Sequence, residues 1–131
     1  MEDCKLVLKP QFKNISHIEK LMRTSPNIDD DKRNAALIIS TEFFDNIVEH
    51  AVSPDDSFIT ITVSKRERTR ITFSYQTSNF QELINGVRRS RPHYNSEAGR
   101  YRGMGLRMTR YLASHIVYND DKPISSIVVY L

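Results

Sequence analysis

Apolar residues recur at helical spacing in two stretches of the first half of the chain. The first covers residues 15–22 and stops before a proline, which ends the helical pattern. In the second, longer stretch, Asn27 or Asp29 can cap the helix, and its end should lie near Val52 because Pro54 disfavours helix in the residue before it. One stripe of this long helix is apolar and should face the core: Ala35, Ala36, Ile39, Phe43, Ile47 and Ala51.

Alternation of apolar and polar residues predicts strands in the middle and at both ends of the chain. Residues 59–64 and 71–75 alternate β-branched or aromatic residues with polar ones, which is typical of half-buried strands. A short polar link, residues 65–68, makes them an antiparallel hairpin. Short apolar runs predict a first strand at residues 6–8 and a last one at 127–131.

The stretch after this hairpin is predicted to hold a short helix, a basic loop and a second helix. Residues 79–87 favour the short helix, with Phe80, Leu83 and Ile84 turned inward. Residues 88–102 lack apolar periodicity and are predicted to form a mobile loop. The next helix should open at residues 103–105 and keep its apolar spacing to Ile116. A strand then begins at Val117 and Tyr118, and residues 120–123 turn into the last strand.

This order of elements predicts one domain over residues 1–131. Helices and an antiparallel-leaning sheet in this order indicate a two-layer α/β sandwich, in which the helices cover one face of the sheet. A sheet covered on one face also explains the strict alternation of the middle strands.

Composition and charge indicate where the protein resides in the cell, but they do not identify its function. The chain has 131 residues and a formal net charge of +3, and no apolar run approaches the ~20 residues that span a bilayer. Acidic residues stand near the N-terminus where a signal peptide would be basic, and a single Cys4 excludes an intrachain disulfide and a multi-cysteine metal site. We therefore expect a cytoplasmic protein without a membrane partner.

The first candidate motif lies on the long helix. Glu42, Asn46 and His50 are each four residues apart and so share a helix face beside the apolar stripe. The carboxylate and the amide oxygen of this row suit Mg²⁺, which prefers hard ligands, and a carboxylate one turn away can orient or deprotonate a nucleophile. A plain solvated helix face fits the same three residues.

The second candidate motif is a glycine pair at the start of a helix. Gly103 and Gly105 would let backbone N–H groups approach an anion at the positive end of the helix dipole. An ordinary flexible helix start gives the same pattern.

Taken together and in this order, the two motifs resemble the GHKL superfamily of gyrase, heat-shock chaperone, histidine kinase and mismatch-repair ATPases, which have the Bergerat ATP-binding fold with a mixed, mostly antiparallel sheet. The chain is most similar to the bacterial anti-sigma-factor serine/threonine kinases, since residues 42–51 resemble their N box and residues 103–106 their glycine box. The resemblance covers nearly the whole chain.

The resemblance implies specific roles for these residues. Asn46 would hold Mg²⁺, Glu42 would act as base or orienting carboxylate, Gly103 and Gly105 would approach the phosphates of ATP, and Arg100 or Arg102 would neutralise them. His50 would lie at the same nucleotide site. The protein would regulate transcription by binding a sigma factor, would act on a small antagonist protein, and could self-associate as a homodimer.

One part of the family pattern is missing. The family carries an Asp-x-Gly box after the hairpin, where Asp reads the adenine amino group; here Tyr75 stands in the place of Asp and Thr77 in that of Gly. Residues 71–81 contain neither an acidic residue nor a glycine. We expect the Tyr75 ring to fill part of the adenine cavity, which leaves weak ATP binding, another phosphate ligand or no nucleotide.

The alternatives are a non-catalytic protein-binding module of the same fold and a nucleic-acid-binding protein. The second would use the basic loop, which interleaves cations with aromatic rings: Arg88, Arg89, Arg91, His93, Tyr94, Arg100, Tyr101 and Arg102. We favour a solvated, positively charged lid, because charge favours association with anions without specifying which.

Overall fold

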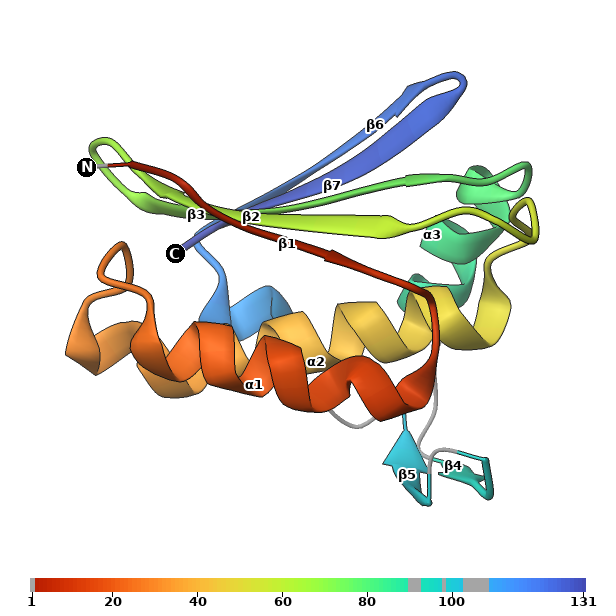
Figure 1. The fold of residues 1–131 in the computed structure, drawn as a ribbon, viewed down its shortest axis with the longest axis horizontal. Coiled ribbons are helices and arrows are strands. Elements are labelled where there is room, and N and C mark those ends of the chain that lie inside the picture. Colours follow the sequence, from red (N-terminus) through yellow and green to blue (C-terminus); the bar gives the residue numbers. More distant parts are fainter. Residues whose placement is uncertain (1, 90–92, 98, 103–108) are drawn as a thin grey trace.

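A five-stranded sheet forms one layer and the helices pack on one of its faces (Figure 1). The computed structural model describes residues 2–89, 93–97, 99–102 and 109–131. The strand order is β1-β2-β3-β7-β6, and each neighbouring pair is antiparallel. The elements of these two layers are β1 (Cys4–Leu8), α1 (Ile15–Thr24), α2 (Arg33–His50), β2 (Ile59–Lys65), β3 (Thr69–Gln76), α3 (Phe80–Arg89), β6 (His115–Asp121) and β7 (Ile124–Tyr130), with short 3-10 turns at Phe12–Asn14 and Asp30–Lys32. The predicted α/β class with helices on one face is confirmed.

The inner face of the sheet is apolar because each strand turns every second side chain toward the helices. One cross-strand row shows the register, with Leu6 opposite Ile61, Ile61 opposite Phe73, Phe73 opposite Ile127 and Ile127 opposite Tyr118. Three of these five residues, Ile61, Phe73 and Ile127, are buried in the core. The alternation predicted for the middle strands is therefore correct.

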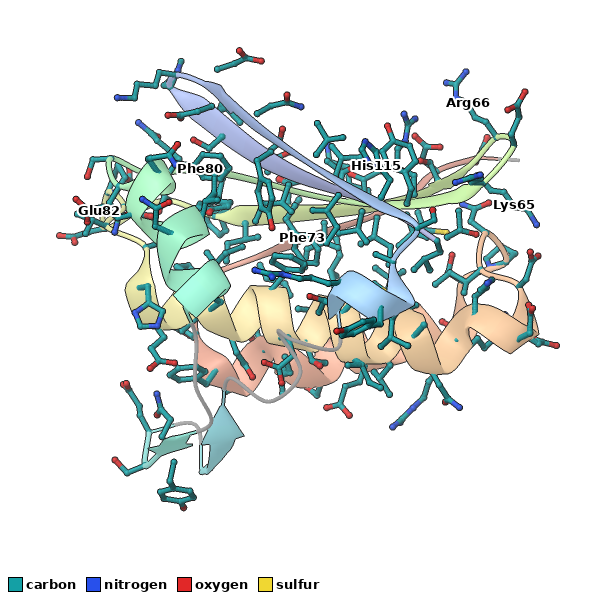
Figure 2. The ribbon with its side chains drawn as sticks, turned by 180° about the vertical axis from the view of Figure 1, so that it is seen from behind. Lys65, Arg66, Phe73, Phe80, Glu82 and His115 are labelled. Carbon is teal, nitrogen blue, oxygen red and sulfur yellow. The ribbon has the colours of Figure 1, made fainter. Side chains whose placement is uncertain are left out.

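Helix α2 is buried on more than one side. Four of the six residues of the predicted stripe, Ala36, Ile39, Phe43 and Ile47, are buried, whereas Ala35 and Ala51 are half-buried. The Phe43 ring lies 5.8 Å from that of Phe73 on β3. Figure 2 places Phe73 between the sheet and α2. Phe44, outside the predicted stripe, is also buried, because α1 packs alongside α2 and α3 covers its C-terminal part.

The predicted cap of α2 is wrong. Asn27 is buried and donates through Nδ2 to the carbonyls of Glu2 (2.9 Å) and Val63 (3.0 Å), so it joins the loop to the segment before β1 and to β2. Asp29 precedes the 3-10 turn without capping it and pairs with Lys65 on β2. Tertiary contacts replace the local cap: the two carbonyls take the Asn27 amide protons, and Asn27 Oδ1 is buried without a hydrogen bond to a described residue.

Several elements in the last third differ from the prediction in their boundaries or type. Helix α3 extends to Arg89, and the expected loop contains a small hairpin, β4 (His93–Asn95) with β5 (Arg100–Arg102), turned by Gly99 at φ 70°. Residues 109–112 are helical, but Ile116 belongs to strand β6. Pairing with β7 also extends β6 to Asp121 and starts β7 at Ile124, three residues earlier than expected.

No helix in the described part of the chain has the length and apolar character needed to cross a membrane.

Candidate functional site

The predicted polar row on α2 passes from buried to exposed along the helix. Asn46 is only 5 % exposed, whereas Glu42 is half-buried and interacts with another group of the chain. His50, the last residue of α2, has a side chain that is 51 % exposed, with Nε2 3.7 Å from Oε1 of Glu49. Glu42 and Asn46 are therefore at least partly shielded from solvent, whereas His50 is exposed.

The Asn46 amide is the unusual group of this row. Its side chain forms no hydrogen bond with any described residue, and neither of its polar atoms is a fully buried, unpaired atom, so both are available to water or to a ligand. An amide oxygen with a carboxylate one turn away offers the hard donors that Mg²⁺ takes from protein, with waters and phosphates completing the shell. Asn46 and Glu42 therefore fit a magnesium ion in the chemistry of their oxygens.

Asp45 was missed by the sequence reasoning. It lies next to Asn46 and is 2 % exposed, and its carboxylate interacts with another group of the chain. Helical spacing puts it off both the polar row and the predicted apolar stripe. Its only sequence signal was an acidic residue inside a largely apolar helix segment.

Tyr75 fills space at the end of β3, in the interior between the sheet and α3. It is 2 % exposed and shares the inward phase of Ile71 and Phe73, as predicted. Its ring meets Phe80 edge-on at 6.1 Å, and Phe80 in turn meets Tyr118 at 6.4 Å. Its hydroxyl is buried with no hydrogen-bond partner among the described residues, and burial, followed by the charges of Asp120 and Tyr118, raises the pKa of Tyr75.

The segment from Tyr75 to Asn79, which we call the β3–α3 corner, is tied to the end of α2. Asn79 Oδ1 accepts from the Val52 N–H (3.0 Å), and Asn79 Nδ2 donates to the His50 carbonyl (2.8 Å). The Thr77 hydroxyl lies 2.6 Å from Asn79 Oδ1 and 3.0 Å from the Val52 carbonyl, so these acceptors share its proton. These hydrogen bonds engage the polar side chains of Thr77 and Asn79 and hold the corner against the end of α2.

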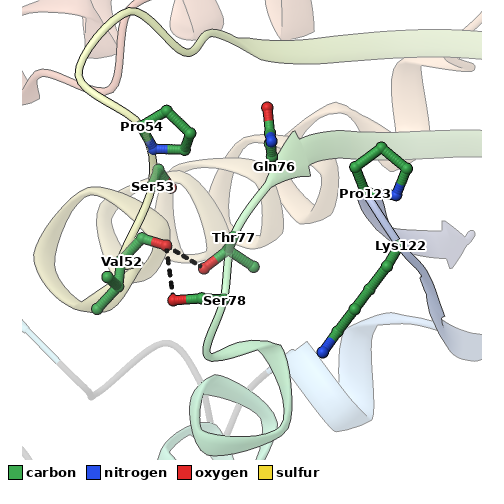
Figure 3. A pocket seen from close by; sticks show the side chains of 8 residues that line it. All are labelled: Val52, Ser53, Pro54, Gln76, Thr77, Ser78, Lys122 and Pro123. Atoms are coloured by element: carbon green, nitrogen blue, oxygen red, sulfur yellow. Dashed lines mark hydrogen bonds between the residues drawn. The ribbon is translucent and has the colours of Figure 1, made fainter.

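A surface pocket of about 700 Å³ lies on the outside of this corner (Figure 3). It is lined by Val52, Ser53, Pro54, Gln76, Thr77, Ser78, Lys122 and Pro123. Neither Asn46 nor Tyr75 lines it, so it is separate from the polar row of α2.

The structure does not describe the glycine pair of the predicted site. Gly103 and Gly105 lie outside the described residues, and so does the expected meeting of Asn46 with them. The backbone of Arg100 and Arg102 forms β5, on the side of the helix layer that faces away from the sheet (Figure 1). Among the described residues, no group of three or more acidic, histidine or cysteine side chains could hold a metal ion.

No protein-family model matches the chain, and no curated protein matches it with significant similarity.

Proposed function

We propose that this chain is a regulatory module of the Bergerat type that binds a sigma factor, a small antagonist protein, or both. The proposal rests on the order of the elements, on an antiparallel sheet with helices on one face, and on the polar row in the middle of the long helix. The resemblance to anti-sigma-factor kinases supplies the class of partner.

The observation that carries the proposal is the nearly buried Asn46 amide without a hydrogen bond among the described residues. An amide oxygen that no described residue engages has its lone pairs available for a metal ion or for a water bound to that ion. Asn46 would hold Mg²⁺, which would bind the phosphates of ATP, and Glu42 would orient or deprotonate a partner's serine.

The β3–α3 corner supports loss of the adenine half. The Tyr75 ring occupies the interior at the position of the family's Asp, and the polar atoms of Thr77 and Asn79 are engaged with the end of α2. A base could enter only by displacing a buried aromatic ring. We therefore propose that partner binding, rather than tight ATP binding, is the main activity; if catalysis is retained, it is that of a protein serine/threonine kinase.

The partner is tested by mixing the purified chain with sigma factors and small antagonist domains from its host. Size-exclusion chromatography with light scattering should show a stable complex with one of them. If neither class forms a complex, with or without Mg-ATP, the proposed function is wrong.

Calorimetry with Mg-ATP tests the nucleotide site separately. We expect binding weaker than micromolar, and we expect Asn46→Ala to lower it further. Micromolar binding of Mg-ATP would contradict the loss of the adenine half without touching the partner proposal.

A further inference from the structure

The β2–β3 hairpin carries three arginines at the end of the sheet opposite the β3–α3 corner. Residues 66–68 link the paired residues Lys65 and Thr69, and the Arg66 N–H approaches the Arg68 carbonyl at 3.4 Å across this tight turn. Figure 2 shows Lys65 and Arg66 at this tip. Strand β3 separates the two ends by about 23 Å, at ~3.3 Å per residue.

The hairpin is anchored to the body of the protein. The Thr69 hydroxyl donates to the Asn27 carbonyl at 2.7 Å, and Lys65 pairs with Asp29. These contacts hold the turn against the loop before α2, so the arginine side chains project from a fixed base.

Arg66, Glu67, Arg68, Arg70 and Tyr130 line a pocket of about 370 Å³, which we call the arginine pocket. Arg68 Nη1 donates to Ser114 Oγ at 2.9 Å, and Arg70 Nε donates to Ser64 Oγ at 3.2 Å. Each guanidinium has five donors, so hydroxyls that orient it through one leave others for an anion. The arginine pocket is therefore partly preorganised.

The arginine pocket carries a net positive charge. Three arginines and one glutamate give the lining a formal charge of +2, and none of the three guanidiniums forms an ion pair with a carboxylate in the described part of the chain. Lys65 is already neutralised by Asp29. A phosphate monoester carries about −1.5 to −2 at pH 7 and matches this charge, and its oxygens suit the guanidinium fork.

An aromatic wall completes the arginine pocket. On the helix-free face of the sheet, Ser64, Arg70, Tyr130 and His115 are cross-strand neighbours on β2, β3, β7 and β6. The rings of Tyr130 and His115 lie 5.8 Å apart. The volume is in the range of small-molecule sites and leaves room for an organic group beside a phosphate.

We infer that the arginine pocket binds the dianionic phosphate of a small organic phosphate ester, with the organic group against Tyr130. This site is independent of the proposed nucleotide site, because it shares no residue with α2 or the β3–α3 corner. It takes its ligand without magnesium.

The test is an NMR titration of the ¹⁵N-labelled full chain, without magnesium and at constant ionic strength. The probes are inorganic phosphate and phenyl phosphate. We expect saturable shifts of amides 64–70, 114–116 and 130, with phenyl phosphate binding several-fold tighter than inorganic phosphate. Each of Arg68→Gln and Arg70→Gln should weaken binding by about tenfold, as expected for a charge-assisted hydrogen bond.

Matched variants separate the arginine pocket from general charge. Arg23→Gln removes an exposed arginine on α1 and should leave binding unchanged, whereas Glu67→Gln should strengthen it. Arg70→Lys keeps the charge without the fork and should weaken binding less than Arg70→Gln. Dispersed amide spectra of every variant will show that the fold is retained.

Four results would overturn the inference. One is the absence of saturable shifts at the hairpin; another is unchanged binding by Arg68→Gln and Arg70→Gln. The third is tighter binding of an oligonucleotide or acidic peptide to the same amides, which would reassign the surface to a macromolecule. Shifts confined to residues 42–50 would contradict the inference while leaving the proposed function standing.

Discussion

Asn46 and Asn79 lie in the two regions that the proposed nucleotide site would combine, and their surroundings differ. Asn79 accepts two hydrogen bonds at the corner and donates one to the end of α2. Asn46 is more deeply buried and forms no hydrogen bond with a described residue. The Asn79 amide holds the corner to the end of α2, whereas the Asn46 amide can still bind a ligand. The difference matches the proposal above, in which Asn46 holds a metal ion and the β3–α3 corner does not receive a base.

The largest expected effect comes from cutting the contact that joins the two regions. Phe43 lies on α2 and packs against Phe73 on β3, the strand that carries Tyr75. Phe43→Ala should lower the free energy of unfolding by about 3–5 kcal/mol, because it removes a fully buried ring and leaves a cavity. Urea unfolding measures this. Val7→Ala, on an exposed side chain, should change stability by less than about 0.5 kcal/mol, and equal effects would contradict the packing.

Removing the Asn79 amide should have the next largest effect. Asn79→Ala breaks the bonds that hold the corner to His50 and Val52, and should cost about 1–3 kcal/mol. Thermal unfolding read alongside Asn46→Ala gives a matched pair of amide deletions. If Asn46→Ala were the more destabilising of the two, the contrast between the regions would be reversed.

Deleting the Tyr75 hydroxyl should be neutral or stabilising by up to about 1 kcal/mol near pH 7, because the hydroxyl is buried without a partner among the described residues. The pKa of Tyr75 is raised above its ordinary value of about 10. The native state therefore holds this proton more tightly than the unfolded state. Below about pH 10, Tyr75 is protonated in both states and does not change the free energy of unfolding. Above about pH 10 the unfolded state loses the proton first, so the free energy of unfolding falls by up to about 1.4 kcal/mol per pH unit.

Tyr75→Phe should abolish this alkaline loss. Unfolding free energies of the native chain and of the variant, compared at pH 9 and pH 11, should diverge in favour of the variant as pH rises. Parallel curves would show that Tyr75 ionises as easily in the native state as in the unfolded chain.

The smallest effect on stability is expected for Asn46→Ala, under about 1 kcal/mol, since no hydrogen bond to a described residue is lost. Its effect should appear instead in ligand binding. Mn²⁺, used as a paramagnetic substitute for Mg²⁺, should bind the chain in the presence of a nucleoside triphosphate, bind weakly to Asn46→Ala and be rescued in Asn46→Asp. Unchanged Mn²⁺ binding in Asn46→Ala would place the metal elsewhere.

Periodicity in the sequence was enough to predict much of the scaffold. The alternation of residues 59–64 and 71–75 predicted the central hairpin and the inward phase of Tyr75, and the apolar spacing of α2 predicted its core stripe. These features follow from local geometry, because the period of an element determines which side chains share a face.

Tertiary packing decided the rest. It turned Asn27 from an expected helix cap into a buried link between strands, buried Asp45 beside Asn46, and paired residues 93–95 with residues 100–102 where the sequence suggested a loop. It also brought Arg68 to Ser114 and Arg70 beside Tyr130, which no local pattern connects. Such contacts join segments far apart along the chain, so sequence spacing predicts the face a residue occupies, and only the packed layers determine which residue it meets there.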